Sequence, residues 1–167
     1  RMVKSLYTAP HVVSMDEADV TDLVSLREKE KKSAEEKGVK LTYLAFIIKA
    51  ATVALKQHPY LNASLDAQSN EIVLKRYYNI GIAVDTPEGL MVPVIKNADQ
   101  KSIMELAKET EKLSEESRTR KIKLSDLKGN TFTITNIGSI GGLFSTPVIN
   151  PPDVAILGVH RIRDMPV

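Results

Sequence analysis

The chain has 167 residues, of which 43% are hydrophobic and 26% are charged, and 23 basic against 21 acidic side chains give a formal net charge of +2. A chain of this length can build one full core, so we expect one domain, and its mixed charges supply no basic field that would bind nucleic acid. The absence of cysteine excludes disulfides, thiolate metal sites and cysteine nucleophiles, and the three histidines have no zinc-binding spacing, so we expect no metal.

The first two predicted helices lie in the N-terminal third of the chain. Residues 16–37 open with acidic side chains, carry apolar residues at helical spacing and stop at Gly38, which predicts an amphipathic helix. A second helix is predicted from its N-cap Thr42 to Gln57, and it is apolar on nearly all sides. Its apolar run 43–55 is shorter than the roughly 20 residues of a membrane span. With no apolar leader at the start, we expect a soluble, cytoplasmic protein without a membrane partner.

Short strands are predicted in the middle of the chain. Residues 62–65 and 72–78 flank a turn-prone segment and predict a hairpin. Residues 79–85 and 90–95 are apolar, β-branched runs that suit a buried sheet, and Pro93 favours an edge or a bulge in the second run.

A third helix is predicted over residues 102–118, with one apolar face and a highly charged exposed side. Beyond it, residues 131–135 alternate like a strand, and residues 153–159 form a last apolar strand. Helices that are interleaved with strands and hairpins predict an α/β sandwich, in which helices cover a mixed sheet.

Few residues suggest chemistry on pattern alone. The glycine-rich segment 138–142 lacks the Lys-Ser/Thr ending of a phosphate loop, and Ser139 does not match the strand-to-helix turn of a serine hydrolase. Structural roles explain His11 and His58 best. His160 follows a strand and could act as a base, although composition favours a lining or structural role.

Nine segments, taken in order, together resemble one family. They are residues 8–12, 16–24, 26–27, 38–42, 61–64, 78–85, 89–94, 129–138 and 147–158. The chain closely resembles the catalytic domain of dihydrolipoamide acyltransferases, the cores of 2-oxoacid dehydrogenase multienzyme complexes. The resemblance extends over essentially all of residues 1–167, which we assign to this one domain.

The resemblance implies a two-layer fold similar to chloramphenicol acetyltransferase, assembled as homotrimers with an active-site channel at each subunit interface. Such trimers stack into a larger shell and work with a lipoyl domain, a 2-oxoacid decarboxylase and dihydrolipoyl dehydrogenase. The implied reaction passes an acyl group from S-acyl-dihydrolipoamide to coenzyme A. Both sulfur atoms then belong to substrates, which fits a chain without cysteine.

The resemblance also assigns site residues. Thr135 takes the position of the hydroxyl that stabilises the oxyanion. The residues implied to contact coenzyme A or line its route are Arg27, Thr42, Asp85, Asn136, His160 and Ile162.

The family's catalytic base is a histidine in the signature H-x-x-x-D-G, which does not occur in the 167 residues. His160 lies upstream of that signature, so we expect residues 1–167 to lack the base and to be inactive alone. Two alternatives stay open. One is a non-catalytic oligomeric scaffold formed by a truncated or diverged core, and the other is a small-molecule acetyltransferase similar to the chloramphenicol enzymes.

Overall fold

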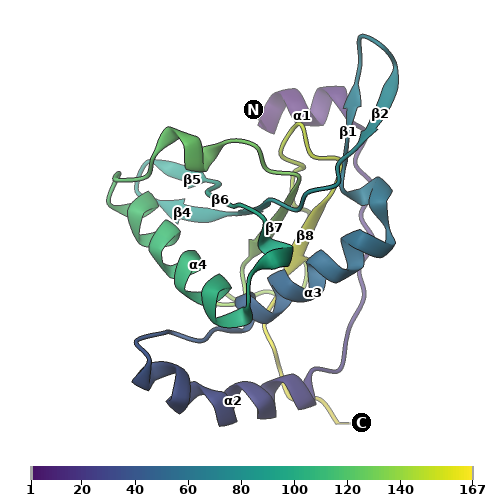
Figure 1. Ribbon diagram of the computed structural model, residues 1–167. Helices are drawn as coiled ribbons and strands as arrows, with labels where there is room; N and C mark the ends of the chain where they lie inside the picture. The colour runs from purple at the N-terminus through teal and green to yellow at the C-terminus, as the bar shows by residue number, and fades with distance from the viewer. Residues whose placement is uncertain (1, 167) are drawn as a thin grey trace.

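A four-stranded mixed sheet lies at the centre of the computed structural model, which describes residues 2–166 (Figure 1). Its strand order is β6-β3-β7-β8. The strands are β3 (Ile80–Ile82), β6 (Val94–Ile95), β7 (Phe132–Asn136) and β8 (Ile156–Val159). Strands β3, β7 and β8 run parallel, and β6 pairs antiparallel with β3. The predicted mixed sheet is therefore confirmed, and β6, which follows Pro93, is an edge strand as expected.

Two helices cover one face of this sheet. They are α3 (Tyr43–Gln57) and α4 (Ile103–Arg118), which lie side by side in Figure 1 and pack against the strands through one apolar core. Helix α4 begins with a capping box, because Ser102 Oγ accepts from the Glu105 N–H while the Glu105 carboxylate accepts from the Ser102 N–H. That hydrogen bond from the Ser102 backbone lowers the pKa of Glu105. Both predicted helices are confirmed, with bounds within one residue of those expected.

The alternation along β7 separates the core from the opposite face of the sheet. Phe132 and Ile134 belong to the hydrophobic core beneath the helices. Because successive side chains of a strand point to opposite faces, Thr133 and Thr135 face away from α3 and α4. This row of hydroxyl side chains therefore lies on the face that the helices leave uncovered.

Two hairpins flank the sheet. Strands β1 (Ala63–Asp66) and β2 (Glu71–Leu74) pair antiparallel and project from the body of the molecule, which confirms the first predicted hairpin (Figure 1). Strands β4 (Val84–Thr86) and β5 (Gly89–Met91) form the second. The predicted strands 79–85 and 90–95 are thus each divided, because the chain leaves the central sheet near Ala83 and pairs locally across the turn before Gly89.

The N-terminal segment differs most from expectation. Helix α1 (Met2–Thr8) was not predicted. Helix α2 (Thr21–Glu36) begins later than residue 16, after a turn in which the Asp19 carboxylate accepts two hydrogen bonds from Thr21. The Thr21 side-chain bond is the main reason that the pKa of Asp19 is lowered.

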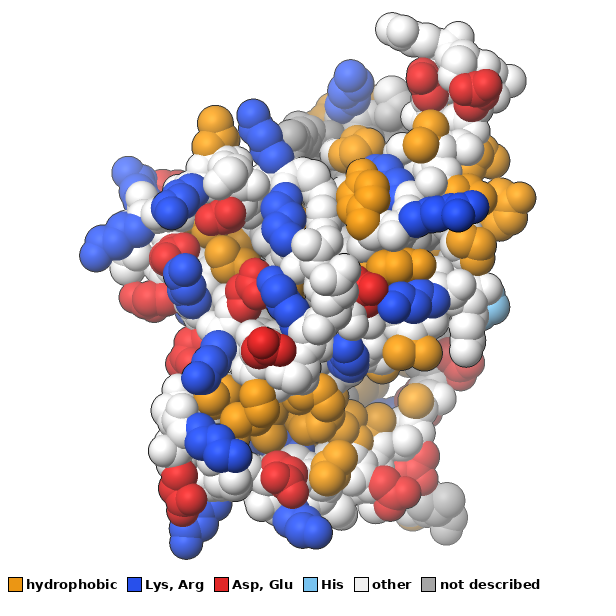
Figure 2. Space-filling model, in the orientation of Figure 1, with side chains coloured by type: hydrophobic (Ala, Val, Ile, Leu, Met, Phe, Trp, Pro, Cys, Tyr) orange, Lys and Arg blue, Asp and Glu red, His pale blue; other side chains and the backbone are white. Residues whose placement is uncertain are grey.

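The kind of exposed side chain changes over the surface between α4 and α2. Figure 2 shows charged side chains of both signs over α4, whereas hydrophobic side chains gather in the space between α4 and α2. Short 3-10 turns complete the fold at Pro59–Leu61, Ala98–Gln100 and Leu124–Leu127. Within residues 2–166, no helix is both long and apolar enough to cross a membrane.

Candidate active site

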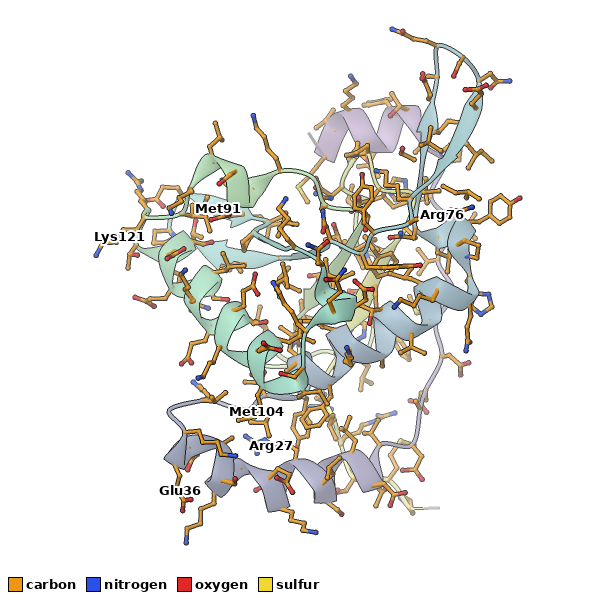
Figure 3. The ribbon with its side chains drawn as sticks, in the orientation of Figure 1. Arg27, Glu36, Arg76, Met91, Met104 and Lys121 are labelled. Carbon is orange, nitrogen blue, oxygen red and sulfur yellow. The ribbon has the colours of Figure 1, made fainter. Side chains whose placement is uncertain are left out.

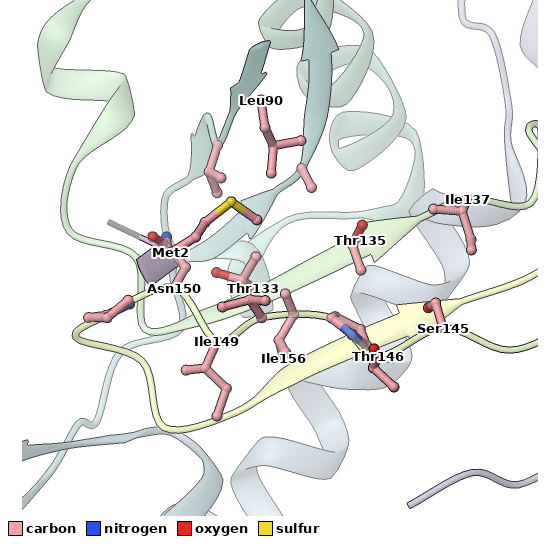
Figure 4. Close-up of a pocket in the computed structure, with 15 residues that line it drawn as sticks. Met2, Leu90, Thr133, Thr135, Ile137, Ser145, Thr146, Ile149, Asn150 and Ile156 are labelled. Atoms are coloured by element: carbon pink, nitrogen blue, oxygen red, sulfur yellow. The ribbon is translucent and has the colours of Figure 1, made fainter. Parts of the chain in front are cut away.

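A pocket of about 230 Å³ lies on the sheet face opposite α3 and α4. Strands β7 and β8 supply one wall, and the segment 145–151 supplies another (Figure 4). The other lining residues are Met2 of α1, Leu90 of β5, Ala83, Val92 and Ile137. Most of the wall is apolar. The polar side chains among the lining residues are Thr133, Thr135, Ser145, Thr146 and Asn150. Such a mixture of an apolar wall with a few polar groups is typical of a small-molecule site.

Thr135, the predicted catalytic residue, lies in this pocket (Figure 4). It sits near the end of β7, where its Cα is the register partner of Gly158 in β8. The hydroxyl of Thr133 is engaged by Asp153, whereas no such partner among the described residues holds the hydroxyl of Thr135. The Thr135 O–H is therefore available to donate to an atom inside the pocket.

Asp153 is a buried carboxylate behind the pocket wall, and sequence reasoning missed it. Its Oδ2 atom accepts from Thr133 Oγ1 at 2.6 Å and from Asn130 Nδ2 at 2.7 Å. Its other oxygen has no partner among residues 2–166. Burial raises the pKa of Asp153, although the hydrogen bonds from Thr133 and Asn130 act in the opposite direction. The carboxylate fixes the rotamer of Thr133 and ties β7 to the segment before β8.

A hydrogen bond between Ser145 and His160 joins the pocket wall to the end of β8. Ser145 Oγ lies 2.9 Å from His160 Nε2, and Ser145 lines the pocket. His160 was predicted to line the coenzyme's route, and the structure places it behind Ser145 rather than among the lining residues. Ser145 itself was not predicted, because a serine in an irregular segment carries no sequence signal.

The remaining predicted residues from β4 to the C-terminal segment lie outside the pocket lining. Asn136 is exposed, and its Oδ1 accepts from the Gly138 N–H at 2.9 Å in a turn after β7. Asp85 is exposed on β4 opposite Leu90, and Ile162 is exposed in the C-terminal segment.

Arg27 and Thr42 form a second group at the junction of α2 and α3. Arg27 Nε donates to the Leu41 carbonyl at 3.1 Å, its guanidinium lies 5.2 Å from the centroid of the Tyr43 ring, and it also pairs with Glu28 (Figure 3). Thr42 is the N-cap of α3 by backbone conformation, but its side chain makes no capping hydrogen bond. These contacts hold the Arg27 side chain in one place, and the structure does not bring this group onto the pocket around Thr135.

No group of three or more His, Asp or Glu side chains that could hold a metal ion occurs in the described part of the chain. The chemistry that the pocket itself offers is hydrogen-bond donation from the Thr135 hydroxyl beside an apolar wall.

Comparison with known proteins gives one consistent result. Residues 1–167 match the model of the 2-oxoacid dehydrogenases acyltransferase catalytic domain. The chain is 53% identical over 163 residues to the dihydrolipoyllysine-residue acetyltransferase component of the pyruvate dehydrogenase complex of Bacillus subtilis, covering 98% of this chain and 37% of that protein. The chain therefore spans less than two fifths of the length of this relative.

Two solved structures are similar over nearly the whole chain. Dihydrolipoamide acetyltransferase from Azotobacter vinelandii superposes with a TM-score of 0.97 at 44% identity, covering 99% of this chain and 68% of that one. The cubic core of the pyruvate dehydrogenase multienzyme complex also gives a TM-score of 0.97, at 43% identity, with the same coverage of 99% and 68%.

Proposed function

The chain belongs to the family of 2-oxoacid dehydrogenase acyltransferase catalytic domains, and we therefore propose that it transfers an acyl group from S-acyl-dihydrolipoamide to coenzyme A. The observation that carries the proposal is the placement of Thr135, whose hydroxyl faces a largely apolar pocket. We also propose that the two-layer fold is of the chloramphenicol acetyltransferase type.

The proposed reaction assigns a specific step to Thr135. The coenzyme A sulfur attacks the thioester carbon, negative charge develops on the carbonyl oxygen, and the dihydrolipoamide sulfur then leaves. A hydroxyl donor aimed at that oxygen is worth about 10²–10³-fold in turnover, because the charge is larger in the transition state than in the substrate. The apolar wall strengthens this hydrogen bond by excluding water.

The reaction also needs a base for the attacking thiol. A thiol with a pKa near ~8.5 is only about 3% ionised at neutral pH, so removal of its proton by a positioned base contributes about 10²–10⁴-fold. We place this base outside residues 1–167, in the family's H-x-x-x-D-G signature, since the 167 residues do not contain that signature. His160 does not take this role in our proposal, because its Nε2 atom is engaged by Ser145.

We propose that coenzyme A contacts Arg27 and Thr42 and also the predicted residues that lie outside the pocket lining between β4 and the C-terminal segment. The fixed guanidinium of Arg27 suits a phosphate of the coenzyme, and Thr42 lies beside it at the start of α3. The other proposed contacts are Asp85, Asn136, His160 and Ile162. Because these residues lie outside the pocket lining of one chain, a channel shared with a second subunit is the arrangement that would unite them with Thr135.

Exposed apolar side chains support the proposed homotrimer. Leu65 and Ile72 are register partners in the β1–β2 hairpin, and 61% and 58% of their surfaces are exposed. A projecting hairpin with such a face is suited to packing against another subunit. We propose that trimers build a larger shell that works with a lipoyl domain, a 2-oxoacid decarboxylase and dihydrolipoyl dehydrogenase. A cytoplasmic location stays a prediction.

One experiment tests the proposed function. The full-length natural polypeptide is incubated with dihydrolipoamide and acetyl-, succinyl- or branched-chain acyl-coenzyme A, and thioester formation on dihydrolipoamide is measured in the reverse direction. We expect transfer that requires both substrates. An assembled protein that transfers none of these acyl groups would instead be the non-catalytic scaffold, and transfer to small hydroxylated acceptors but not to dihydrolipoamide would indicate the stand-alone acetyltransferase.

A further inference from the structure

We propose that His11 is a positioning residue for the reaction, whose neutral imidazole holds the pocket-lining segment 145–151 through the backbone of Ile149. This inference rests on the proposed function for its kinetic consequence. The contact itself comes from the structure, in which the Ile149 N–H donates to His11 Nε2 at 3.0 Å.

The N-terminal segment holds Ile149 from two sides. Ser5, which is fully buried in α1, donates its hydroxyl to the Ile149 carbonyl at 2.6 Å. Both backbone polar groups of Ile149 are therefore satisfied by residues that are more than one hundred positions away in the sequence. Met2, in the same helix as Ser5, lines the pocket directly, so α1 and the segment 145–151 form one continuous wall (Figure 4).

The segment depends on such contacts because it has little regular structure of its own. Residues 144–150 belong to no helix or strand, so no ladder of backbone hydrogen bonds fixes their path. Among the described residues, three side-chain hydrogen bonds hold the segment. Ser5 Oγ donates to the Ile149 carbonyl, the Ile149 N–H donates to His11 Nε2, and Ser145 is bonded to His160. Loss of the His11 bond would leave the Ile149 N–H unpaired and let the wall move.

The two contacts of His11 specify a single protonation state. Its Nδ1 atom lies 2.6 Å from the Ala9 carbonyl oxygen, which can only accept, so Nδ1 carries a proton. The Ile149 N–H can only donate, so Nε2 must present its lone pair. The ring is therefore the neutral Nδ1–H tautomer, and a proton on Nε2 would face the Ile149 N–H and break the contact.

A series of substitutions separates positioning from general structural support. In His11→Gln, the side-chain amide oxygen can replace Nε2 as the acceptor for the Ile149 N–H. In His11→Asn, the shorter side chain can restore only the bond to the Ala9 carbonyl. His11→Phe keeps the ring volume and removes both bonds. His58→Phe is the matched control, since His58 is an exposed histidine at the end of α3.

The variants are compared in the full-length assembled protein by acyl transfer kinetics. We expect His11→Phe and His11→Asn to lower kcat between about 10- and 10²-fold, because a displacement of about 1 Å near a reacting group costs that much. His11→Gln should recover most of the loss, and His58→Phe should match the wild type. If His11→Phe does not assemble, the comparison of His11→Gln with His11→Asn tests whether the bond to the Ile149 N–H supports kcat.

A second readout does not depend on activity. Nitrogen-15 NMR of histidine-labelled assembled protein should show a neutral Nδ1–H imidazole whose signal disappears in His11→Phe. Equal activity of the Gln and Asn variants, normal activity of His11→Phe, or an Nε2–H tautomer would overturn the proposal. If the wild type transfers no acyl group, the proposed function is wrong. The tautomer of His11 then still tests whether this ring accepts a hydrogen bond from the Ile149 N–H.

Discussion

The Ser145 hydroxyl and the His160 Nε2 atom meet 2.9 Å apart beside Gly158, the register partner of Thr135. A β carbon at position 158 would lie 3.5 Å from both Ser145 Oγ and His160 Cε1, and 3.2 Å from the ring of Pro147. The absence of a side chain at Gly158 therefore lets the pocket segment close against β8 next to the proposed catalytic hydroxyl.

A side chain at position 158 should displace the pocket segment that packs against β8, and a larger side chain should displace it more. We expect Gly158→Ala to lower acyl transfer a few-fold, because its β carbon would meet the Pro147 ring at 3.2 Å and overpacking costs about 1–3 kcal/mol. Gly158→Val should lower acyl transfer more, because its two further methyl groups add to this crowding. Kinetics of the two variants in the assembled protein check this. A valine variant that is as active as the wild type would show that the close approach at Gly158 does not matter.

Asp153 should make stability depend on pH in a defined direction. Because burial raises its pKa above the ordinary value of 3.8, the native state binds a proton more tightly than the unfolded state does. Its favourable contribution is complete below pH 3.8 and is lost as the pH rises through the raised native pKa. Asp153→Asn, which stays neutral, should therefore be more stable than the wild type near pH 7, and its advantage should shrink on acidification.

Urea unfolding of both proteins at several pH values measures this difference, and the comparison cancels the titration of other groups. An advantage of Asp153→Asn that is constant with pH would contradict the burial of a charge at this position.

The sequence predicts those parts of the fold that depend on local patterns. Helix α4 follows from the apolar period after its cap Ser102, and the β1–β2 hairpin follows from its turn residues. Thr135 could be assigned only through the family resemblance, since an alternating strand does not distinguish one threonine from another.

The contacts that position the site could not be predicted in this way. Asp153 meets Thr133 across 20 residues, Ser145 meets His160 across 15, and His11 meets Ile149 across 138. Such pairs depend on how strands and irregular segments come together in space, and neither composition nor period carries that information.

Arg27 should matter for one substrate only. We expect Arg27→Ala to raise the KM for coenzyme A about 10-fold or more and to leave the KM for dihydrolipoamide unchanged, because a guanidinium is suited to a phosphate that only the coenzyme carries. Arg27→Lys should recover only part of the affinity, since lysine lacks the planar fork that donates to Leu41. Equal weakening of both substrates would instead indicate damage to the junction of α2 and α3.

The β1–β2 hairpin should contribute to assembly. The double substitution Leu65→Lys with Ile72→Glu replaces an exposed apolar register pair by opposite charges that can pair across the hairpin. We expect the hairpin to persist and the proposed trimer to weaken, which sedimentation of the full-length protein measures. Gln68→Lys, in the turn of the same hairpin, is the control. An unchanged assembly mass in the double variant would exclude the hairpin from the interface.

Kinetics of Thr135→Ala in the full-length assembled protein test whether this hydroxyl stabilises the oxyanion. With dihydrolipoamide and acyl-coenzyme A varied in turn, we predict that kcat falls about 10²–10³-fold, that both KM values stay within about twofold, and that Thr135→Ser retains most of the activity. Wild-type turnover in Thr135→Ala would contradict the assignment of this hydroxyl to the oxyanion.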